Sequence, residues 1–345
     1  MTKKSSLPSI SILTITLNPN PQVFKKVLES IKNQDYPKYL IEHIIVDGGS
    51  KKNTISFLKK YGCKLIIKSE LREQSEARRV FAVKEARNEI VLWLESDNSL
   101  SHNESLRELV QPFMDDNKIF STFTLHYGIN KEMKVLDRYC ALLGVSDPVA
   151  FYLNKADRET WLTNTYEKGK IIKRRSNYDT VEFNKSNLPT VGDNGFLTRR
   201  KVLLKANISF ESYLHIDIYV DLLKLGYKRF GVVKKVNIEH DIGKGILNLV
   251  RRRVLYVKRY SLSKYINHRR YAVFDFNSSK DVVNLLKYIF YTVTFIQPLF
   301  LSTRGFLKIR DTAWFLHPFM CWLFLIYYLR FTSFSLLKLK LSKKL

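Results

Sequence analysis

The stretch IEHIIVDGGSKKNTISFLKKYGCKLII, residues 41–67, decides the fold. Its apolar beginning, Ile41–Val46, predicts a strand that ends abruptly at Asp47 and two glycines. A helical segment over Thr54–Tyr61 and a second strand over Lys64–Ile67 follow. Two strands joined by a helix form a β-α-β unit, so this stretch predicts a parallel sheet.

The same alternation continues on both sides of this stretch. Ser9–Leu17 is β-branched and apolar and predicts the first strand, and Val23–Asn33 has apolar residues at helical spacing. After it come a polar helix over Gln74–Ala86 and a fourth strand over Ile90–Leu94. This order predicts an α/β fold whose mostly parallel, Rossmann-like sheet has helices on both faces.

The middle of the chain is harder to interpret. From Leu100 to Asn187 the pattern assigns no elements. Regularity returns with a helix over Ile216–Leu225, for which Gly226 is the expected C-terminal cap, and with a strand over Arg229–Val236.

Acidic residues follow two of the predicted strands. Asp47 comes directly after the second strand, and Glu95 and Asp97 come after the fourth. Ligands of open parallel sheets bind at the carboxyl ends of the strands. We therefore expect these side chains to converge on one crevice.

The charge of the chain indicates a polyanionic neighbour. Lys and Arg number 58 against 32 Asp and Glu, a formal net charge of +26. The segment from Arg251 to Arg270 is densely basic and precedes an apolar stretch that begins near Val282, which favours anionic membrane lipids as the partner. Aromatic-flanked basic strands, helix-turn-helix spacing and zinc ligands are not found in the sequence, so no nucleic acid is expected.

The cysteines and the N-terminal sequence indicate the cellular compartment in which the protein is expected to lie. The three cysteines lack CxxC spacing, which argues against a zinc site or a disulfide framework and fits a reducing cytosol. The N-terminal apolar run is short for a signal peptide. We expect a membrane-associated protein whose α/β domain lies on the cytoplasmic face.

The C-terminal apolar region has two pieces. Tyr288–Leu301 is uncharged but short, and Pro298 is expected to interrupt it. Thr312–Leu329 is uncharged over a length near the minimum for a span. The basic loop Thr303–Asp311 between them would lie outside the cell if both pieces crossed the membrane, against the positive-inside tendency. Two spans and a helical pair lying in the membrane surface both stay open.

These patterns predict four regions along the chain. They are an α/β domain over 1–255, a basic juxtamembrane linker over 256–281, a membrane-associated helical pair over 282–335 and a basic tail over 336–345.

Four short motifs carry a resemblance to a known family. They are Thr16-Leu17-Asn18, Val46-Asp47-Gly48-Gly49-Ser50, Glu76-Ala77-Arg78 and Glu95-Ser96-Asp97. In this order and spacing, the chain over roughly residues 9–255 resembles the family 2 glycosyltransferases, which have the GT-A fold.

The resemblance implies a hexosyltransferase-like, inverting enzyme. It would move a sugar from a nucleotide-sugar donor to a lipid-linked or surface-glycan acceptor, assisted by a divalent metal (Mn or Mg) and a carboxylate base. A polyprenyl-phosphate sugar synthase is a close alternative. A non-catalytic membrane scaffold with a decayed GT-A domain is another, because two of the family's motifs are altered.

The resemblance also implies which residues bind the nucleotide-sugar. These are Thr16, Asn18, Asp47, Arg78 and Glu95. For Asp47 the alternative is a turn in which its carboxylate bonds its own backbone. Arg78 matches the arginine of the family's Ala-Arg-Asn stretch or is a helix-surface cation.

The metal site is implied by the position of Glu95-Ser96-Asp97, where the family has a DxD motif. Glu95 stands where Asp is usual, so it is expected to contact the sugar or ribose, while Asp97 holds the metal. His240 follows a strand and is expected to close the metal site. The alternative is a solvated acidic loop.

The base is expected near the start of the helix that ends at Gly226. The family has Glu-Asp where this chain has Leu214-His215. Asp217 is the preferred base, with His215 either orienting or replacing it, unless Asp217 is only a helix N-terminal acid. Asp193 and Asn194 lie in a loop that resembles the family's acceptor-side segment.

Overall fold

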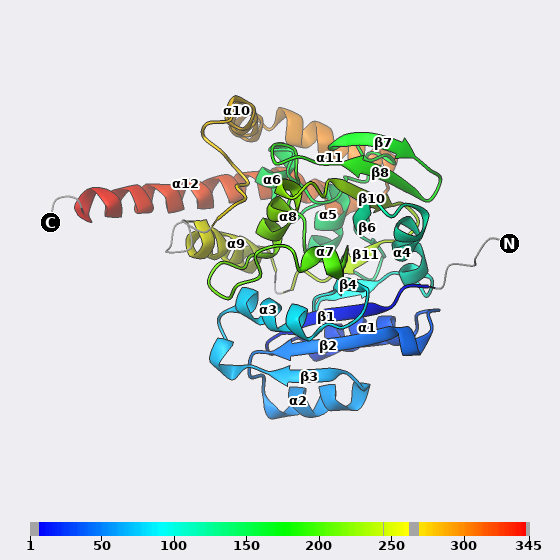
Figure 1. Cartoon of the computed structure of the whole chain (residues 1–345). Helices are drawn as coiled ribbons and strands as arrows, with labels where there is room; N and C mark the ends of the chain where they lie inside the picture. The colour runs from blue at the N-terminus through cyan, green and yellow to red at the C-terminus, as the bar shows by residue number, and fades with distance from the viewer. Residues whose placement is uncertain (1–6, 244, 262–268, 343–345) are drawn as a thin grey trace. The chain divides into compact units, whose positions relative to one another are not determined.

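The computed structural model describes residues 7–243, 245–261 and 269–342. Figure 1 labels most of the helices and strands named below. The chain divides into two compact units. Unit 1 comprises residues 1–128 and 164–241, and unit 2 comprises 129–163 and 242–345. The four regions predicted from the sequence stay a prediction, and the expected linker and tail lie partly outside the described residues.

Unit 1 carries a mixed sheet of nine strands within the described ranges, in the order β3-β2-β1-β4-β9-β6-β10-β8-β7. The strands are β1 (Ile10–Thr16), β2 (Ile41–Asp47), β3 (Lys64–Ile67), β4 (Ile90–Trp93), β6 (Ile119–Thr124), β7 (Lys170–Arg174), β8 (Tyr178–Glu182), β9 (Phe196–Arg199) and β10 (Arg229–Val233). Strands β3, β2, β1 and β4 run parallel, as does the pair β6–β10, whereas β9 is antiparallel to both of its neighbours. The predicted mostly parallel sheet is confirmed for the first four strands.

The helices of unit 1 connect these strands. They are α1 (Pro21–Lys32), α2 (Lys52–Leu58), α3 (Ser75–Glu85), α4 (Ser105–Asp115), α7 (Arg200–Leu203) and α8 (His215–Lys224), with short 3₁₀ turns η1 (Lys38–Leu40), η2 (Lys59–Tyr61) and η3 (Ser69–Leu71). Asn20 caps α1 through its side chain, and Pro21 occupies the first helical position, where no N–H is needed. Gly226 ends α8 with a positive φ of 88°, as expected from the sequence.

A second, two-stranded ladder lies in the same unit. It pairs β5 (Asn98–Leu100) with β11 (Ile238–His240) in antiparallel register. This ladder matters for the site, because it places His240 opposite Asn98, directly after the fourth strand of the large sheet.

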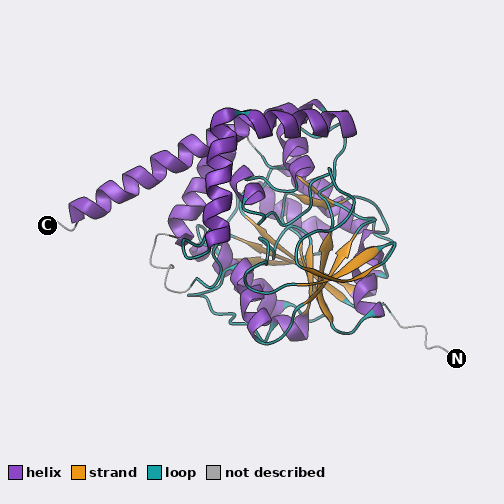
Figure 2. Cartoon of the chain, turned by 90° about the horizontal axis from the view of Figure 1, so that it is seen from above, coloured by secondary structure: helices purple, strands orange, loops and turns teal. Residues whose placement is uncertain are grey.

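Unit 2 is built from helices and loops over its described residues (Figure 2). The helices are α5 (Val135–Leu143), α6 (Pro148–Tyr152), α9 (Ile246–Ser261), α10 (Ser279–Thr294), α11 (Ile296–Lys308), η5 (Thr312–Leu316) and α12 (His317–Ser342). Leu136 and Leu142 of α5 share one buried cluster with Trp314, Met320 and Phe324. The segment 129–163 and the C-terminal helices therefore form a common core.

The first apolar piece of the C-terminal region differs from the sequence prediction. The chain breaks at Phe295, whose φ is 59°, and not at Pro298. Pro298 lies in the first turn of α11, where its missing N–H costs no helical hydrogen bond. Helices α10 and α11 are bent by 81° at this break. Thr312–Phe331 is, by length and composition, long and apolar enough to cross a membrane.

Candidate active site

Adjacent strand ends bring the predicted site residues toward one edge of the sheet. Strands β2, β1 and β4 are neighbours and parallel, so the residues that follow them, Asp47, Asn18 and Glu95, lie at the same edge. Strand β9 is antiparallel to β4 and pairs Phe196 with Trp93. The loop that precedes β9, which contains Asp193, therefore ends beside the end of β4.

The turns after β1 and β2 are bonded to each other. Asn18 accepts a hydrogen bond from the Lys51 N–H (2.9 Å), and its own N–H donates to the Ser50 hydroxyl (2.7 Å). One oxygen of Asp47 accepts from the N–H groups of Gly49 and Ser50, and the other accepts from the Ser50 hydroxyl. Asp47 thus forms the turn that was the alternative interpretation, and its contact with a nucleotide stays a prediction.

Arg78 is buried under the turn after β2. Its Nη1 donates to the carbonyl oxygens of Leu71 (3.1 Å) and Arg72 (2.7 Å). A Cβ atom on Gly48 would lie only 1.9 Å from that nitrogen, so a glycine is needed there. Arg78 is therefore not a surface cation. Its Nε and the Oγ1 of Thr16 are buried and have no hydrogen-bond partner among the described residues. Donor binding by Arg78 and Thr16 stays a prediction.

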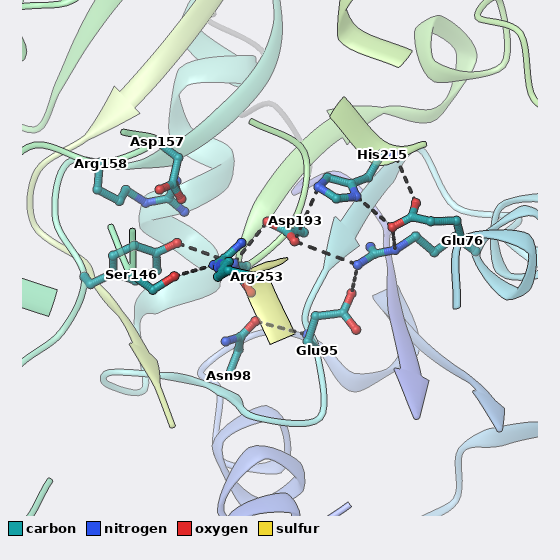
Figure 3. A network of polar contacts seen from close by, with 12 residues as sticks. Glu76, Glu95, Asn98, Ser146, Asp157, Arg158, Asp193, His215 and Arg253 are labelled. Carbon is teal, nitrogen blue, oxygen red and sulfur yellow. Dashed lines mark hydrogen bonds and ion pairs between the residues drawn. The ribbon is translucent and has the colours of Figure 1, made fainter. Parts of the chain in front are cut away.

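Arg79 is the centre of a buried charge network that was not expected from the sequence. Figure 3 shows the acidic members of this network, Glu76, Glu95 and Asp193, together with His215. Its Nη2 lies 2.8 Å from Glu95 and 3.9 Å from Asp193, its Nε lies 3.7 Å from Glu76, and the guanidinium covers the Trp93 ring. Arg79 and Glu95 each replace a residue that is usual in the resembled family. Because Arg79 and Glu95 both differ from the family pattern, the sequence already contained a signal that the two side chains are paired.

Glu76 joins this network to the start of α8. One carboxylate oxygen accepts from the His215 backbone N–H (3.0 Å), and the other lies 2.9 Å from His215 Nδ1. Burial alone would raise the pKa of Glu76, but the neighbouring His215 and Arg79 outweigh it and lower the pKa to about 2. Glu76 therefore stays ionised and fixes the orientation of the imidazole.

His215 lies between two carboxylates. Its Nε2 is 3.6 Å from Asp193, on the side opposite Glu76. Burial lowers the pKa of His215, but Glu76 and Asp193 outweigh burial and raise the pKa above its ordinary value. The Nε2 atom is thus a proton-accepting or proton-donating group beside the acidic loop before β9.

The pKa of Glu95 is shifted in the opposite direction to that of Glu76. Burial, together with the nearby Asp193 and Asp97, raises the pKa of Glu95 to about 7 in spite of Arg79. A carboxyl group that titrates near neutral pH at a strand end is typical of a functional site.

Two of the predicted metal ligands lie together. Asp97 Oδ2 is 3.6 Å from His240 Nε2, and the Asp97 carbonyl accepts a hydrogen bond from the Asp241 N–H (2.9 Å). Among the described residues no group of three His, Cys, Asp or Glu side chains forms a ready metal cage. A carboxylate and an imidazole nevertheless suit a cation such as Mn²⁺, which takes further oxygen ligands from a diphosphate and water. The donor set therefore fits a metal that binds together with a nucleotide.

The remaining candidates differ in exposure. Asp193 keeps 25% of its side chain exposed, and Asn194 donates to its Oδ1 (3.0 Å). Asp217 is fully buried in the first turn of α8, so an acceptor has no access to it in this conformation. Its role as the base stays a prediction.

A family comparison now identifies the fold. The model of glycosyl transferase family 2 matches residues 11–203, more than half of the chain. The chain belongs to glycosyltransferase family 2. The matched region runs from β1 to β9 and contains Glu76, Arg79, Glu95 and Asp193, whereas His215 lies beyond it. The GT-A fold and the glycosyltransferase activity that the sequence implied are confirmed.

Solved structures with similar folds are distant from this family 2 glycosyltransferase. One of them is a mannosyltransferase, PcManGT from Pyrobaculum calidifontis, in complex with GDP-Man and Mn²⁺. Its sequence identity is 15%, the alignment covers 90% of this chain and 76% of that chain, and the TM-score is 0.49. S. aureus TarS 1-349 in complex with UDP has 14% identity, coverage of 88% and 82%, and a TM-score of 0.45. GalNAc-T7 with UDP, GalNAc and Mn²⁺ has 13% identity, a TM-score of 0.48 and coverage of 76% of this chain and only 50% of that one. No curated protein matches the sequence. Similarity at this level does not extend to the sugar or the acceptor.

Proposed function

We propose that this glycosyltransferase moves a sugar, with inversion, from a nucleotide-sugar to a lipid-linked or surface-glycan acceptor. We further propose that it works at a membrane, with its catalytic domain on the cytoplasmic face. The observation that carries the proposal is the convergence of Glu95, Asp193 and His215 beside the Asp97–His240 pair in unit 1. A polyprenyl phosphate is a closely related acceptor.

The base is best supported as His215. Glu76 bonds Nδ1 and thereby directs the Nε2 lone pair toward Asp193, which resembles the way a carboxylate orients a catalytic imidazole. Nε2 would accept the proton of the acceptor hydroxyl while the sugar carbon is attacked on the face opposite the nucleotide. Asp193 and Asn194 would hold the acceptor hydroxyl in place.

The donor would lie across the ends of β1, β2 and β4. Asp97 and His240 would hold a divalent cation, which when bound neutralises the charge of the departing diphosphate. The unpartnered, buried Oγ1 of Thr16 and Nε of Arg78 offer hydrogen-bonding capacity on the nucleotide side. Glu95, held by Arg79, would face the sugar or ribose.

The test is release of nucleoside diphosphate by purified full-length protein in the presence of membrane lipids. A panel of nucleotide-sugars is offered with and without Mn²⁺, and the product lipid is analysed by mass spectrometry. We expect turnover with one donor class, a requirement for the metal, and a loss of at least about a hundredfold in Asp97→Asn.

The control is Asp35→Asn, because Asp35 is an exposed carboxylate paired with Arg107 on the surface. Full activity of Asp97→Asn would contradict the metal role. Absence of turnover with every donor and acceptor, in a folded protein, would favour the membrane scaffold. A single sugar found on polyprenyl phosphate would identify the synthase variant.

A further inference from the structure

The C-terminal helices of unit 2 expose an unusual amount of apolar surface. More than half of the exposed large apolar side chains in the described chain lie between Val283 and Leu329. On α10, Val283, Leu286, Phe290 and Val293 form one exposed stripe at helical spacing. A helix in water normally shows the opposite pattern.

The inward face of α10 is the more polar one. Asp281, Tyr288 and Thr292 are buried on the side opposite the apolar stripe. Helix α11 continues the same arrangement, since Ile296, Phe300 and Leu307 are exposed. Apolar side chains therefore face outward along both arms of the bent pair, which marks an interaction surface.

The charges around this surface are of one sign. Every charged side chain that is exposed from Ser279 to Phe331 is a cation: Lys280, Lys287, Arg304, Lys308, Arg310 and Arg330. Of the two acids in this range, Asp281 is buried and Asp311 is paired with Arg138 (2.8 Å). An apolar face bordered by cations is complementary to an anionic lipid headgroup layer.

The helices are not arranged to cross a bilayer. Helix α10 has 16 residues, or about 24 Å, which is shorter than the roughly 30 Å hydrocarbon core, and α11 is shorter still. The bend of 81° at Phe295 turns the second arm away from the axis of the first.

The apolar segment Thr312–Leu329, which includes the first part of α12, is bonded near both of its ends to residues 138–147 of unit 2. Asp311, just before Thr312, is paired with Arg138 of α5, and Tyr328 donates to Asp147 (2.7 Å), the N-cap of α6. Between them, His317 is hydrogen-bonded with Tyr139 (2.9 Å) and Tyr152 (3.0 Å). If this segment spanned the membrane, the partners of Asp311 and Tyr328 would have to lie on opposite sides of the bilayer. These partners are Arg138 and Asp147, which are only nine positions apart in the chain.

We propose that α10, α11 and the first half of α12 form a monotopic platform that enters one leaflet of an anionic membrane without crossing it. The proposal deepens the membrane localisation proposed above, and its test needs neither donor nor acceptor. It decides between the two arrangements that the sequence left open, in favour of the helical pair in the membrane surface.

Sidedness is tested by labelling single cysteines. Lys280→Cys, Arg310→Cys and Arg330→Cys are made separately in a Cys63→Ser background, in which the remaining cysteines are buried. Each protein is bound to preformed phosphatidylglycerol–phosphatidylcholine vesicles, and a membrane-impermeant maleimide is added outside. We expect all three positions to react, with the background chain as the blank. Protection of position 330 while position 310 reacts, relieved by detergent, would overturn the proposal.

Binding is tested by flotation with the same vesicles. The double variant Phe290→Glu with Phe300→Glu should bind at least about tenfold more weakly, because it places two charges in the apolar face. The matched control, Tyr39→Glu with Ile67→Glu, changes two exposed apolar residues of unit 1 and should bind like the unchanged chain. Vesicles of phosphatidylcholine alone should bind less protein than vesicles of the anionic mixture. Added salt should make the difference in bound protein smaller, because it screens the charges.

The competing occupant of this surface is a second copy of the chain. If the apolar face joined two copies, the unchanged protein would sediment as a dimer in detergent-free buffer, and the double variant would sediment as a monomer. Neither the unchanged protein nor the double variant would then float with vesicles. That outcome would overturn the proposal independently of whether any sugar transfer is measured.

Discussion

The contact between Glu76 and His215 joins residues that are 139 positions apart, one in α3 and the other at the start of α8. Glu76 is held ionised, and it raises the pKa of the imidazole. A base must be unprotonated to accept a proton, so activity should fall as the pH drops through the pKa of His215.

Replacing Glu76 by Gln tests this relation. The substitution removes the negative charge that raises the pKa of His215, so the acidic limb of the pH–activity profile should move to lower pH. The measurement is kcat/KM for nucleotide-sugar turnover from pH 5 to 9. Asp217→Asn serves as the comparison and should leave the limb in place. If Asp217→Asn abolishes turnover while Glu76→Gln leaves the limb in place, the base is Asp217, as the sequence first indicated.

Sequence reasoning reached part of this residue-level picture. The sequence predicted Asp97 and His240 as one pair, because each follows a predicted strand, and the two side chains do lie together, while their role as metal ligands stays a prediction. The position of His215 followed from its distance to Gly226. Sequence reasoning did not find the partners of Arg79, since a pairing among distant segments leaves no periodicity in the sequence. It also could not decide that Asp217 is buried, because that depends on which face of α8 packs inward.

At the scale of elements, local pattern was most informative where strands and helices alternate. Strands β1 to β4 were predicted within a few residues, since a buried parallel strand is apolar along its length. Strand β9 has four residues and inserts antiparallel between β4 and β6, so its place depends on pairing alone. The break at Phe295 was missed because Pro298 is the stronger local signal.

A glycine at the end of α5 gives a test at this scale. Gly144 has a φ of 82°, and a Cβ there would lie 2.7 Å from the Glu159 carbonyl oxygen. Gly144→Ala should lower the free energy of unfolding by about 2–4 kcal/mol, from backbone strain and steric conflict together. In Gly245→Ala, where φ is 97° and nothing lies within 4 Å, only the strain term should appear. Urea unfolding of both variants measures the difference, and equal losses would contradict the steric part.

At the scale of the whole molecule, the C-terminal helices are part of a folded unit and not a detachable anchor. Trp314, Met320 and Phe324 pack in the same core cluster as Leu136 and Leu142 of α5. The strongly basic composition indicated a membrane partner, but it could not show that segment 129–163 belongs to the same unit as the C-terminal helices.

Deleting residues 279–345 should therefore not give a well-behaved soluble enzyme. Removal of the apolar helices exposes the apolar side of α5, so the shortened chain should aggregate in detergent-free buffer. Size-exclusion chromatography of the shortened and full-length chains, with and without detergent, measures this. A monomeric, soluble and active shortened chain would show that α5 does not depend on the C-terminal helices.

The division of the chain also has a consequence for its synthesis. The polypeptide passes between the two units after residues 128, 163 and 241. Helix α5 leaves the ribosome long before Trp314, its partner in the core, has been made. At about 5–20 residues per second, the delay is roughly 10–30 s. The second half of the sheet is translated during that interval, so the nascent chain must carry an uncovered helix while its catalytic half completes its fold.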